Sequence, residues 1–432
     1  MKHLSWASIF RLGAVQMCLG AIVVISTSTL NRLMVVEGGL PAILPGLLVG
    51  LHYAVQITRT SWGYRSDTLG NRTRFIIGGM AVLGLGGFLA ALGFVLMGTM
   101  FWAGLALSIL AYVLIGAGAG ASGTSLLALL ASTTHPRRRA AAATITWLMM
   151  IFGIAVTATI VGKALDPYSP ALLLKLVGLV SLIAVALTTL AVWGIEARHA
   201  GAPETGKSPV PFREGFAEIW AEPRARNFTI FIFLSMVAYF MQELILEPYA
   251  GFAFGFTPGQ TTQLSGAQNG GVFFGMLTVG IAATGLRFGS LRFWVMAGCA
   301  GSALALLVIA GAGQVASGAM LITPATMALG FFNGMFAVAA IGSMMALAGE
   351  GREAREGTRM GLWGAAQAVA AGLGGVLGSG AADLARHVMG NPSGFGVVFV
   401  AEAALFAVAT LMAAQIIEGR RGNDIGALVP GE

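Results

Sequence analysis

Two polar side chains that could bind a ligand lie inside an apolar stretch of the sequence. His52 and Gln56 occur within the largely apolar run that begins at Pro41. On a helix, residues four apart share one face. Apolar surroundings keep an imidazole neutral, so that it can coordinate a metal ion or form a hydrogen bond. His52 and Gln56 are therefore candidates for binding a ligand; a histidine that only bonds a neighbouring helix is the alternative.

Charged residues near the ends of two other apolar stretches could form an ion pair. Arg32 lies near the end of the first stretch, and Glu243 and Glu247 lie near the end of the seventh. If the two segments face each other, the guanidinium can meet a carboxylate and act as a gate. A buried pair of this kind says little about stability. Arg32 could instead extend toward lipid headgroups or pair with the nearby Glu37.

A single carboxylate, Glu402, lies inside the last apolar stretch. A carboxylate facing lipid is costly, so this side chain must carry a proton or meet a protein partner. We expect either an intramolecular hydrogen bond or a contact with a partner polypeptide.

Motifs for other kinds of chemistry are missing from the sequence. It has no phosphate-binding glycine loop, no C-x-x-C motif and no histidine pair at metal-ligand spacing. The five histidines are too dispersed to form a metal site made by the protein alone. The two cysteines, Cys18 and Cys299, both lie in apolar stretches and are predicted to be buried thiols. We predict that the protein is not an enzyme.

The elements that position these residues are membrane helices. Apolar residues make up 56% of the 432 residues, charged residues only 10%, and the mean hydropathy is +0.82. A water-soluble protein carries about 25% charged residues. The composition therefore predicts a polytopic membrane protein whose first partner is the lipid bilayer. The net charge of +7 follows membrane topology and indicates no nucleic-acid partner.

Apolar segments of about 20 residues predict an all-α integral membrane protein with twelve transmembrane helices. A short cytoplasmic interfacial segment, residues 1–11, comes first. A six-helix bundle over 12–194, a cytoplasmic connector over 195–227, a second bundle over 228–417 and a tail over 418–432 follow. The expected helices are 12–34, 42–62, 75–97, 102–130, 141–162, 171–194, 228–250, 264–286, 293–312, 319–347, 361–382 and 395–417.

The basic residues predict the orientation. Of the 25 lysines and arginines, only Arg32, Lys163, Lys175 and Arg386 fall on one side of the predicted helices. The positive-inside rule therefore puts both termini in the cytoplasm.

The two bundles also resemble each other. Arg139 and Trp147 are spaced like Arg355 and Trp363, and Gly116-x-x-x-Gly120 has a counterpart in Gly330-x-x-x-Gly334. Two six-helix repeats of the same orientation are typical of the major facilitator superfamily. The loop after the second helix resembles that superfamily's cytoplasmic signature, through Gly63, Asp67, Gly70, Arg72 and Arg74. We expect Asp67 to meet the start of the eleventh helix or the arginines at 137–139.

Other segments resemble a narrower family. The fourth expected helix lacks the arginine, and the fifth lacks the glycine–proline run, that are usual in proton-coupled drug exporters. The segments Thr27–Arg32, Pro41–Gln56, Arg137–Trp147, Gln242–Gly251 and Arg355–Trp363 instead look like the bacteriochlorophyll-delivery family, the PucC/LhaA-like assembly factors of light-harvesting complexes.

This resemblance implies a role in delivering bacteriochlorophyll to antenna polypeptides or in assisting their assembly, in the bacterial inner (intracytoplasmic) membrane. Bacteriochlorophyll would be cargo, and pigment-synthesis enzymes would be further partners. Under this reading His52 supplies the axial ligand to the chlorin magnesium, with Gln56 on a pigment carbonyl, and Glu402 contacts an antenna polypeptide. A secondary transporter of a small solute and a permanent accessory subunit of a photosynthetic complex remain the alternatives.

Overall fold

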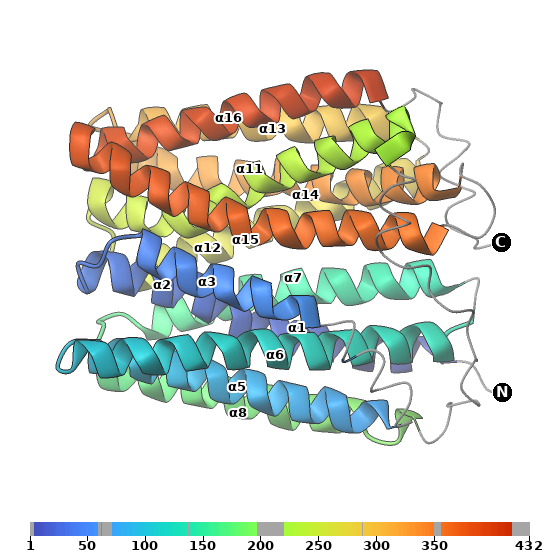
Figure 1. Cartoon of the computed structure of the whole chain (residues 1–432), viewed down its shortest axis with the longest axis horizontal. Coiled ribbons are helices and arrows are strands. Elements are labelled where there is room, and N and C mark those ends of the chain that lie inside the picture. The colour runs from blue at the N-terminus through green and yellow to red at the C-terminus, as the bar shows by residue number, and fades with distance from the viewer. Residues whose placement is uncertain are drawn as a thin grey trace.

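The computed structural model describes residues 4–58, 62, 71–135, 138–196, 220–286, 288–349 and 356–416. Within these ranges the regular secondary structure is helical throughout, and no strand is formed. Figure 1 shows the helices running roughly along one common axis. The prediction of an all-α protein is therefore confirmed for the described part of the chain.

The helices before the connector belong to what we call the first half, residues 4–196. The first expected span is a single continuous helical segment with four parts, and the third to sixth expected spans are long α-helices. Their bounds are α1 (Trp6–Val24), η1 (Ile25–Thr29), α2 (Leu30–Arg32), η2 (Leu33–Glu37), α3 (Ile43–Val55), η3 (Gln56–Thr58), α5 (Arg72–Met97), α6 (Phe101–Thr133), α7 (Arg139–Ala164) and α8 (Pro170–Val192).

The second half, residues 220–416, contains the remaining long helices. They are α11 (Pro223–Phe254), α12 (Pro258–Val279) with its continuation η5 (Gly280–Gly285), α13 (Leu291–Ala312), α14 (Gly318–Gly349), α15 (Glu356–Met389) and α16 (Asn391–Ile416). Among the described residues, ten helices are long and apolar enough to cross a membrane. These ten make the chain a multi-pass membrane protein. The helix α3 has only 13 residues.

Several predicted boundaries were wrong. The first helix begins at Trp6, so residues 6–11 belong to it and do not form a separate interfacial segment. The helix α15 continues to Met389, past the expected end at 382, and α11 already begins at Pro223. Polar and charged residues near helix ends explain these differences, because hydropathy alone does not show whether a helix continues beyond the apolar core.

Polar caps explain where several helices start. The Ser169 hydroxyl accepts a hydrogen bond from the Leu172 backbone N–H at the start of α8. At the start of α12, Thr257 and Gln260 each accept a hydrogen bond from the other's backbone N–H, which makes a capping box. Pro170 and Pro258 stand in the first turns of these helices, where no backbone donor is needed.

The buried apolar side chains form two large clusters. One contains residues between Leu4 and Ile195 together with Leu244, and the other contains residues between Phe228 and Ala413. A small third cluster of Ile151, Val272 and Met276 joins α7 to α12. The chain is thus packed as two helical bundles that meet along a narrower interface.

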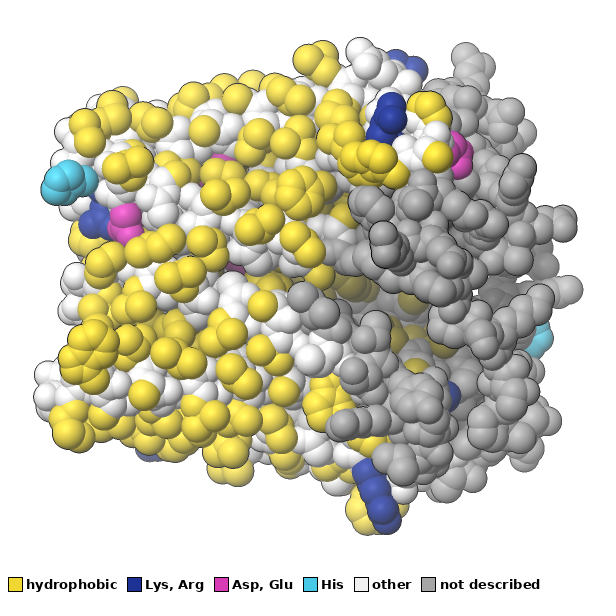
Figure 2. All heavy atoms as spheres, viewed as in Figure 1, with side chains coloured by type: hydrophobic (Ala, Val, Ile, Leu, Met, Phe, Trp, Pro, Cys, Tyr) yellow, Lys and Arg dark blue, Asp and Glu magenta, His cyan; other side chains and the backbone are white. Residues whose placement is uncertain are grey.

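Large apolar side chains also cover the outside of the bundles, as Figure 2 shows for one face. Leu182 on α8 is 71% exposed and Leu304 on α13 is 65% exposed. Soluble proteins rarely expose such a large apolar surface, because its hydration is unfavourable, whereas lipid chains solvate it well. The composition-based prediction of a membrane protein is confirmed.

We use two terms for the ends of the bundle. The terminal end is where α1 begins and α6 and α8 end; there Arg11 donates to the backbone carbonyl of Trp193 at 2.8 Å. The distal end is where η2 ends, α3 begins and α15 meets α16. In Figure 1 the distal end is on the left.

Candidate functional site

The first span departs from regular α-helix at the point where it faces the second half. Residues Ile25–Thr29 and Leu33–Glu37 are π-helical and flank the short α2. Such π segments occur mostly as local interruptions of α-helices and are frequent at functional sites. Here the first π segment contains Ser28 and Thr29, and α2 contains Asn31 and Arg32; all four polar side chains are buried.

All four polar side chains bond to the second half. The Ser28 hydroxyl donates to Glu247, and the Thr29 and Thr262 hydroxyls lie 3.2 Å apart. The Asn31 amide donates to the Leu244 carbonyl at 2.6 Å, and Arg32 donates to the Phe256 carbonyl at 2.7 Å. The first span is therefore hydrogen-bonded to α11, to the residues that follow α11 and to α12.

The predicted ion pair between the halves is not formed in this structure. Arg32 pairs with Glu37, with 2.6 Å between the guanidinium Nη1 and carboxylate Oε1. Glu247 accepts its hydrogen bond from Ser28, and neither it nor Glu243 lies within ion-pair distance of Arg32. The sequence alternative, a pair between Arg32 and Glu37, is the one observed. Glu37 is five residues away in the same span and half-exposed, so it reaches Arg32 without burying a second charge.

Glu247 is nevertheless buried at the interface and is only partly satisfied. Its carboxyl oxygen Oε2 has no hydrogen-bond partner among the described residues. Glu243, one turn earlier on α11, is partly exposed. Of the two predicted gate glutamates, Glu247 is therefore the one that contacts the first half.

A second set of hydrogen bonds between the halves, at the distal end, was not predicted from the sequence. The carboxylate of Asp383 on α15 accepts hydrogen bonds from the backbone N–H groups of Ala42 and Ile43, at 2.9 and 2.8 Å. It thus caps the start of α3 with a residue from the other half, where the helix dipole favours an anion. Arg386 lies 3.4 Å from Asp383 and holds it in place.

The opposite side of the interface has an equivalent contact. The Thr257 hydroxyl at the start of α12 donates to Asp166, which follows α7, at 3.0 Å. Nearby, Gly162 and Gly259 allow the two backbones to touch, because a Cβ at either position would lie within 3 Å of the other's carbonyl oxygen. Together these contacts hold the two halves closed at the distal end.

His52 and Gln56 lie together, as predicted. Both are buried, and their side-chain nitrogens are 2.9 Å apart. Because the Gln56 amide nitrogen is a donor, the His52 Nε2 must accept this hydrogen bond. His52 lies in the last turn of α3, which continues as η3 to Thr58; residues 59–61 of the expected helix 42–62 lie outside the described residues. The carbonyl of His52 packs against Gly116 of α6.

The signature loop is described only in part. Gly63, Asp67 and Gly70 lie outside the described residues, so the contact of Asp67 with the start of the eleventh helix or with the arginines at 137–139 stays a prediction. Arg72 bonds to the Ala128 carbonyl and to Ser132 at the end of α6, while Arg74 is exposed. The backbone N–H groups of Arg72 and Thr73 donate to Glu196, so the start of α5 is braced within the first half.

Glu402 faces the interior of the second half. It is fully buried, so the predicted contact with an antenna polypeptide is wrong for this side chain. The expected intramolecular hydrogen bond is not formed either, since both carboxyl oxygens lack a partner among the described residues. A sequence without amphipathic periodicity in this segment gave no signal for the face on which Glu402 lies.

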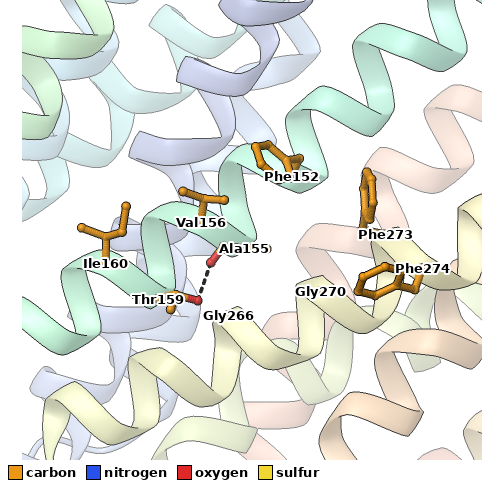
Figure 3. Close-up of a pocket in the computed structure, with 9 residues that line it drawn as sticks. All are labelled: Phe152, Ala155, Val156, Thr159, Ile160, Gly266, Gly270, Phe273 and Phe274. Atoms are coloured by element: carbon orange, nitrogen blue, oxygen red, sulfur yellow. Dashed lines mark hydrogen bonds between the residues drawn. The ribbon is translucent and has the colours of Figure 1, made fainter.

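An apolar groove of about 330 Å³ lies on the outside of the α7–α12 contact (Figure 3). Phe152, Val156 and Ile160 line it from α7, and Phe273 and Phe274 from α12. Gly270 forms part of its wall without a side chain, and a Cβ there would meet open space. The one hydroxyl in the groove, that of Thr159, already donates to the Ala155 carbonyl at 2.8 Å. The groove therefore suits a hydrocarbon chain and offers nothing to a polar group.

Comparison with known proteins identifies the lineage. The family model described as "PUCC protein" matches residues 29–421, which include both halves. The chain belongs to the PUCC protein family. A relative named "Bacteriochlorophyll synthase 44.5 kDa chain" from Rhodobacter capsulatus is 64% identical over 99% of this chain and 100% of its own length. "Protein PucC" of the same organism is 29% identical, covering 95% of this chain and 92% of its own.

Solved structures share the fold of this family member. The peptide transporter POT in complex with alafosfalin is 14% identical, with a TM-score of 0.71 and coverage of 96% of this chain and 97% of its own. The nucleoside transporter NupG is 13% identical, with a TM-score of 0.65 and coverage of 96% and 99%. At such low identity the likeness concerns the fold alone, and that fold is the one seen in membrane transporters of the major facilitator type.

Proposed function

We propose that this protein is a membrane-embedded factor that delivers bacteriochlorophyll to photosynthetic light-harvesting complexes or assists their assembly. The observation that carries the proposal is the family match over residues 29–421, together with the name of the relative that is 64% identical. Antenna polypeptides and pigment-synthesis enzymes are the proposed partners. The bacterial inner membrane, with its intracytoplasmic extensions, is the proposed location.

The proposed architecture has twelve membrane helices in two repeats. The short α3 and the more polar α12 would complete the ten apolar helices. In support, packing pairs of the first half recur in the second: α1 packs on α7 and α8 as α11 packs on α15 and α16, and α5 packs on α6 as α13 packs on α14. Gly116 of α6 meets the His52 carbonyl of α3, and Gly330 of α14 meets the Gln268 carbonyl of α12.

The distribution of basic residues supports an orientation with the terminal end in the cytoplasm. Under this orientation the hydrogen-bonded distal end faces the periplasm, and the structure corresponds to a state closed on that side. Ser28, Asn31, Arg32 and Glu247 would then form the periplasmic closure, with Glu37 as the partner of Arg32.

His52 is the proposed ligand for the magnesium of the pigment cargo. Its burial and its neutral, accepting Nε2 suit that role, since a chlorin magnesium takes one axial donor. The same nitrogen accepts from Gln56 here, so Gln56 has to turn away before His52 can ligate. If the hydrogen bond between Gln56 and His52 opens only when the pigment arrives, it keeps the imidazole in the tautomer whose Nε2 carries no proton.

The groove between α7 and α12 supports an apolar cargo. It lies where the two halves meet and is open to the side of the bundle, so a hydrocarbon chain can enter it from the bilayer without passing a polar surface. A small polar solute, the cargo of the alternative transporter function, would find no partner there. The word "synthase" belongs to the relative's name; we propose a non-enzymatic role beside pigment synthesis for this chain.

The experiment compares His52→Ala with His387→Ala, a matched variant at an exposed histidine outside the proposed site. We expect membranes with His52→Ala to contain fewer antenna complexes and normal amounts of the mutant protein, and those with His387→Ala to be unaffected. Gln56→Ala should have only a modest effect. Wild-type protein purified gently from its native membrane should carry a near-infrared absorption band that His52→Ala weakens. Normal antenna levels in His52→Ala would refute the ligand role, and wild-type protein without pigment would favour the solute transporter.

A further inference from the structure

The interior of the second half holds polar atoms that the proposed pigment site and the distal closure do not use. Glu402 on α16 is fully buried, and both of its carboxyl oxygens lack a partner among the described residues. Asn333 on α14 is also fully buried, and its side-chain Nδ2 lacks one too. Buried polar groups are nearly always paired, so several unpaired ones in one bundle require an explanation.

Helix directions and one ring contact put Asn333 and Glu402 at one level of the bundle. Short connections join α13 to α14, α14 to α15 and α15 to α16 in alternating directions, so α14 and α16 run parallel. Phe336 of α14 and Phe406 of α16 are in ring contact, with centroids 6.3 Å apart. Asn333 lies three residues before Phe336 and Glu402 lies four residues before Phe406, about one turn in the same direction.

A third helix contributes to the same level. The Ser302 hydroxyl of α13 donates to the Asn333 Oδ1 at 2.8 Å, and α13 packs against both α14 and α16. That bond orients the Asn333 amide so that its Nδ2 is the free donor. The geometry therefore places one unpartnered donor, Asn333 Nδ2, at the same level of the bundle as the unpartnered Glu402 carboxyl group.

Gln242 brings α11 to the neighbouring turn of the bundle, about one turn nearer the terminal end than Glu402. It lies seven residues before Tyr249 and so on the same face of α11, and Tyr249 contacts Phe399 of α16 with ring centroids 5.1 Å apart. The Oε1 of Gln242 is buried and unpartnered. An acceptor here can take a hydrogen bond only from a donor, and a carboxyl group donates only when it carries a proton.

No cation balances a charge on Glu402. Among the described residues of α11, α13 and α14, the arginines lie near the terminal end, as Arg226 and Arg292 do. Arg386 of α15 lies near the distal end, stacked over Phe252 and Phe395 and paired with Asp383. Cys299 and Tyr249, which also lie in this bundle, carry no positive charge in any ionisation state. An ionised carboxylate buried without a counter-ion is strongly disfavoured.

We propose that Glu402, Asn333, Ser302 and Gln242 form a proton-binding site inside the second half. Glu402 is held as a neutral carboxylic acid. These atoms make no direct hydrogen bond to one another in the structure. Buried water of the kind that satisfies such groups links the Glu402 carboxyl group to the donor Asn333 Nδ2 and to the acceptor Gln242 Oε1. The ligand is a proton, and the site is separate from the pigment residues and from the distal closure.

The site ties proton exchange to helix movement. Because Glu402 is fully buried on α16, which packs against α11, α13 and α15, it can release its proton only when these helices separate enough to admit water. Gln242 lies on α11, the helix that carries Glu247 at the distal closure. Proton exchange at Glu402 is therefore linked to the position of the helix that joins the two halves.

Infrared spectroscopy of the purified full-length protein tests the site. The wild type at neutral pH should show the carbonyl stretch of a protonated carboxylic acid that Glu402→Gln removes and that Glu37→Gln, at a half-exposed carboxylate, retains. Asn333→Leu should shift this band, because it loses the amide that hydrogen-bonds the linking water, and Ser302→Ala should shift it less. Circular dichroism shows whether each variant is folded, and Glu402→Asp provides a second carboxylic acid if Glu402→Gln does not fold.

Two results would overturn the proposal. The first is a band unaffected by both Glu402→Gln and Glu402→Asp, which would mean that Glu402 is ionised. The second is a band that Glu402→Gln removes but Asn333→Leu leaves at the same frequency, which would mean that Glu402 is neutral without the site described here.

Discussion

The cap on α3 gives the most direct test of the distal closure. Asp383→Ala removes a carboxylate that accepts two backbone hydrogen bonds, at 2.9 and 2.8 Å, from the opposite half. Removing an N-cap acceptor costs about 0.5–2 kcal/mol. The Asp383 side chain is charged and only 23% exposed, so we expect a loss of about 1–2 kcal/mol. This loss lowers the stability of the closed state alone, because only that state has the cap. The ratio of closed to open molecules should then fall by about 5- to 30-fold.

Distances between spin labels measure this ratio. Thr99 follows α5 in the first half and Ser317 precedes α14 in the second; both are exposed at the distal end. Double electron–electron resonance between labels at these sites should show a longer-distance population that grows in Asp383→Ala. The native cysteines are both buried, so labelling at the two introduced sites is selective.

Ser169→Ala is the matched control. Ser169 also caps a helix at the distal end, but it accepts from Leu172 within the same half. This variant should lower thermal stability by a similar amount and leave the label distances unchanged. The reasoning fails if Asp383→Ala leaves the distances unchanged, or if Ser169→Ala lengthens them equally.

Two further predictions concern packing between helices. Asn31→Ala loses the hydrogen bond to the Leu244 carbonyl, worth about 0.5–1.5 kcal/mol, and should lengthen the same label distances by a smaller population shift than Asp383→Ala; an equal or larger shift would contradict the ranking. Gly330→Ala drives a methyl group into the Gln268 carbonyl and should destabilise the protein by about 1–3 kcal/mol, whereas Gly270→Ala points into open space and should be near neutral. Thermal unfolding in detergent compares the two, and equal melting temperatures would show that α12 and α14 can move apart at no cost.

The sequence predicted the fold well because its signal is local. Each long apolar run, such as Pro170–Val192, needs only its own residues to indicate a membrane helix, and that helix is present. The pair His52 and Gln56 was also predictable, since four residues on one helix fix their proximity. Helix ends were less predictable, because α15 continues through the polar residues Asp383 and Arg386.

Contacts between the halves were not predictable in the same way. Arg32 has carboxylates available both within its own span and on α11, and the choice of Glu37 depends on how the spans approach each other. Asp383 gave no signal, because nothing in its own helix indicates that the start of α3 lies opposite. The sequence predicted that a carboxylate at position 402 would be costly in lipid. It did not predict which way the Glu402 side chain points, because that depends on the packing of α16 against three other helices.

The two π segments of the first span also affect how the halves compare in sequence. A π turn takes one more residue than an α turn, so the first span contains residues that α11, an α-helix from Pro223 to Phe254, has no place for. An ungapped alignment of the two halves would therefore lose register within this span. Deleting one residue from Ile25–Thr29 would turn the side chains beyond it by about 100°. Single-residue insertions and deletions, and not only substitutions, can thus decide which side chains of this helix face the other half.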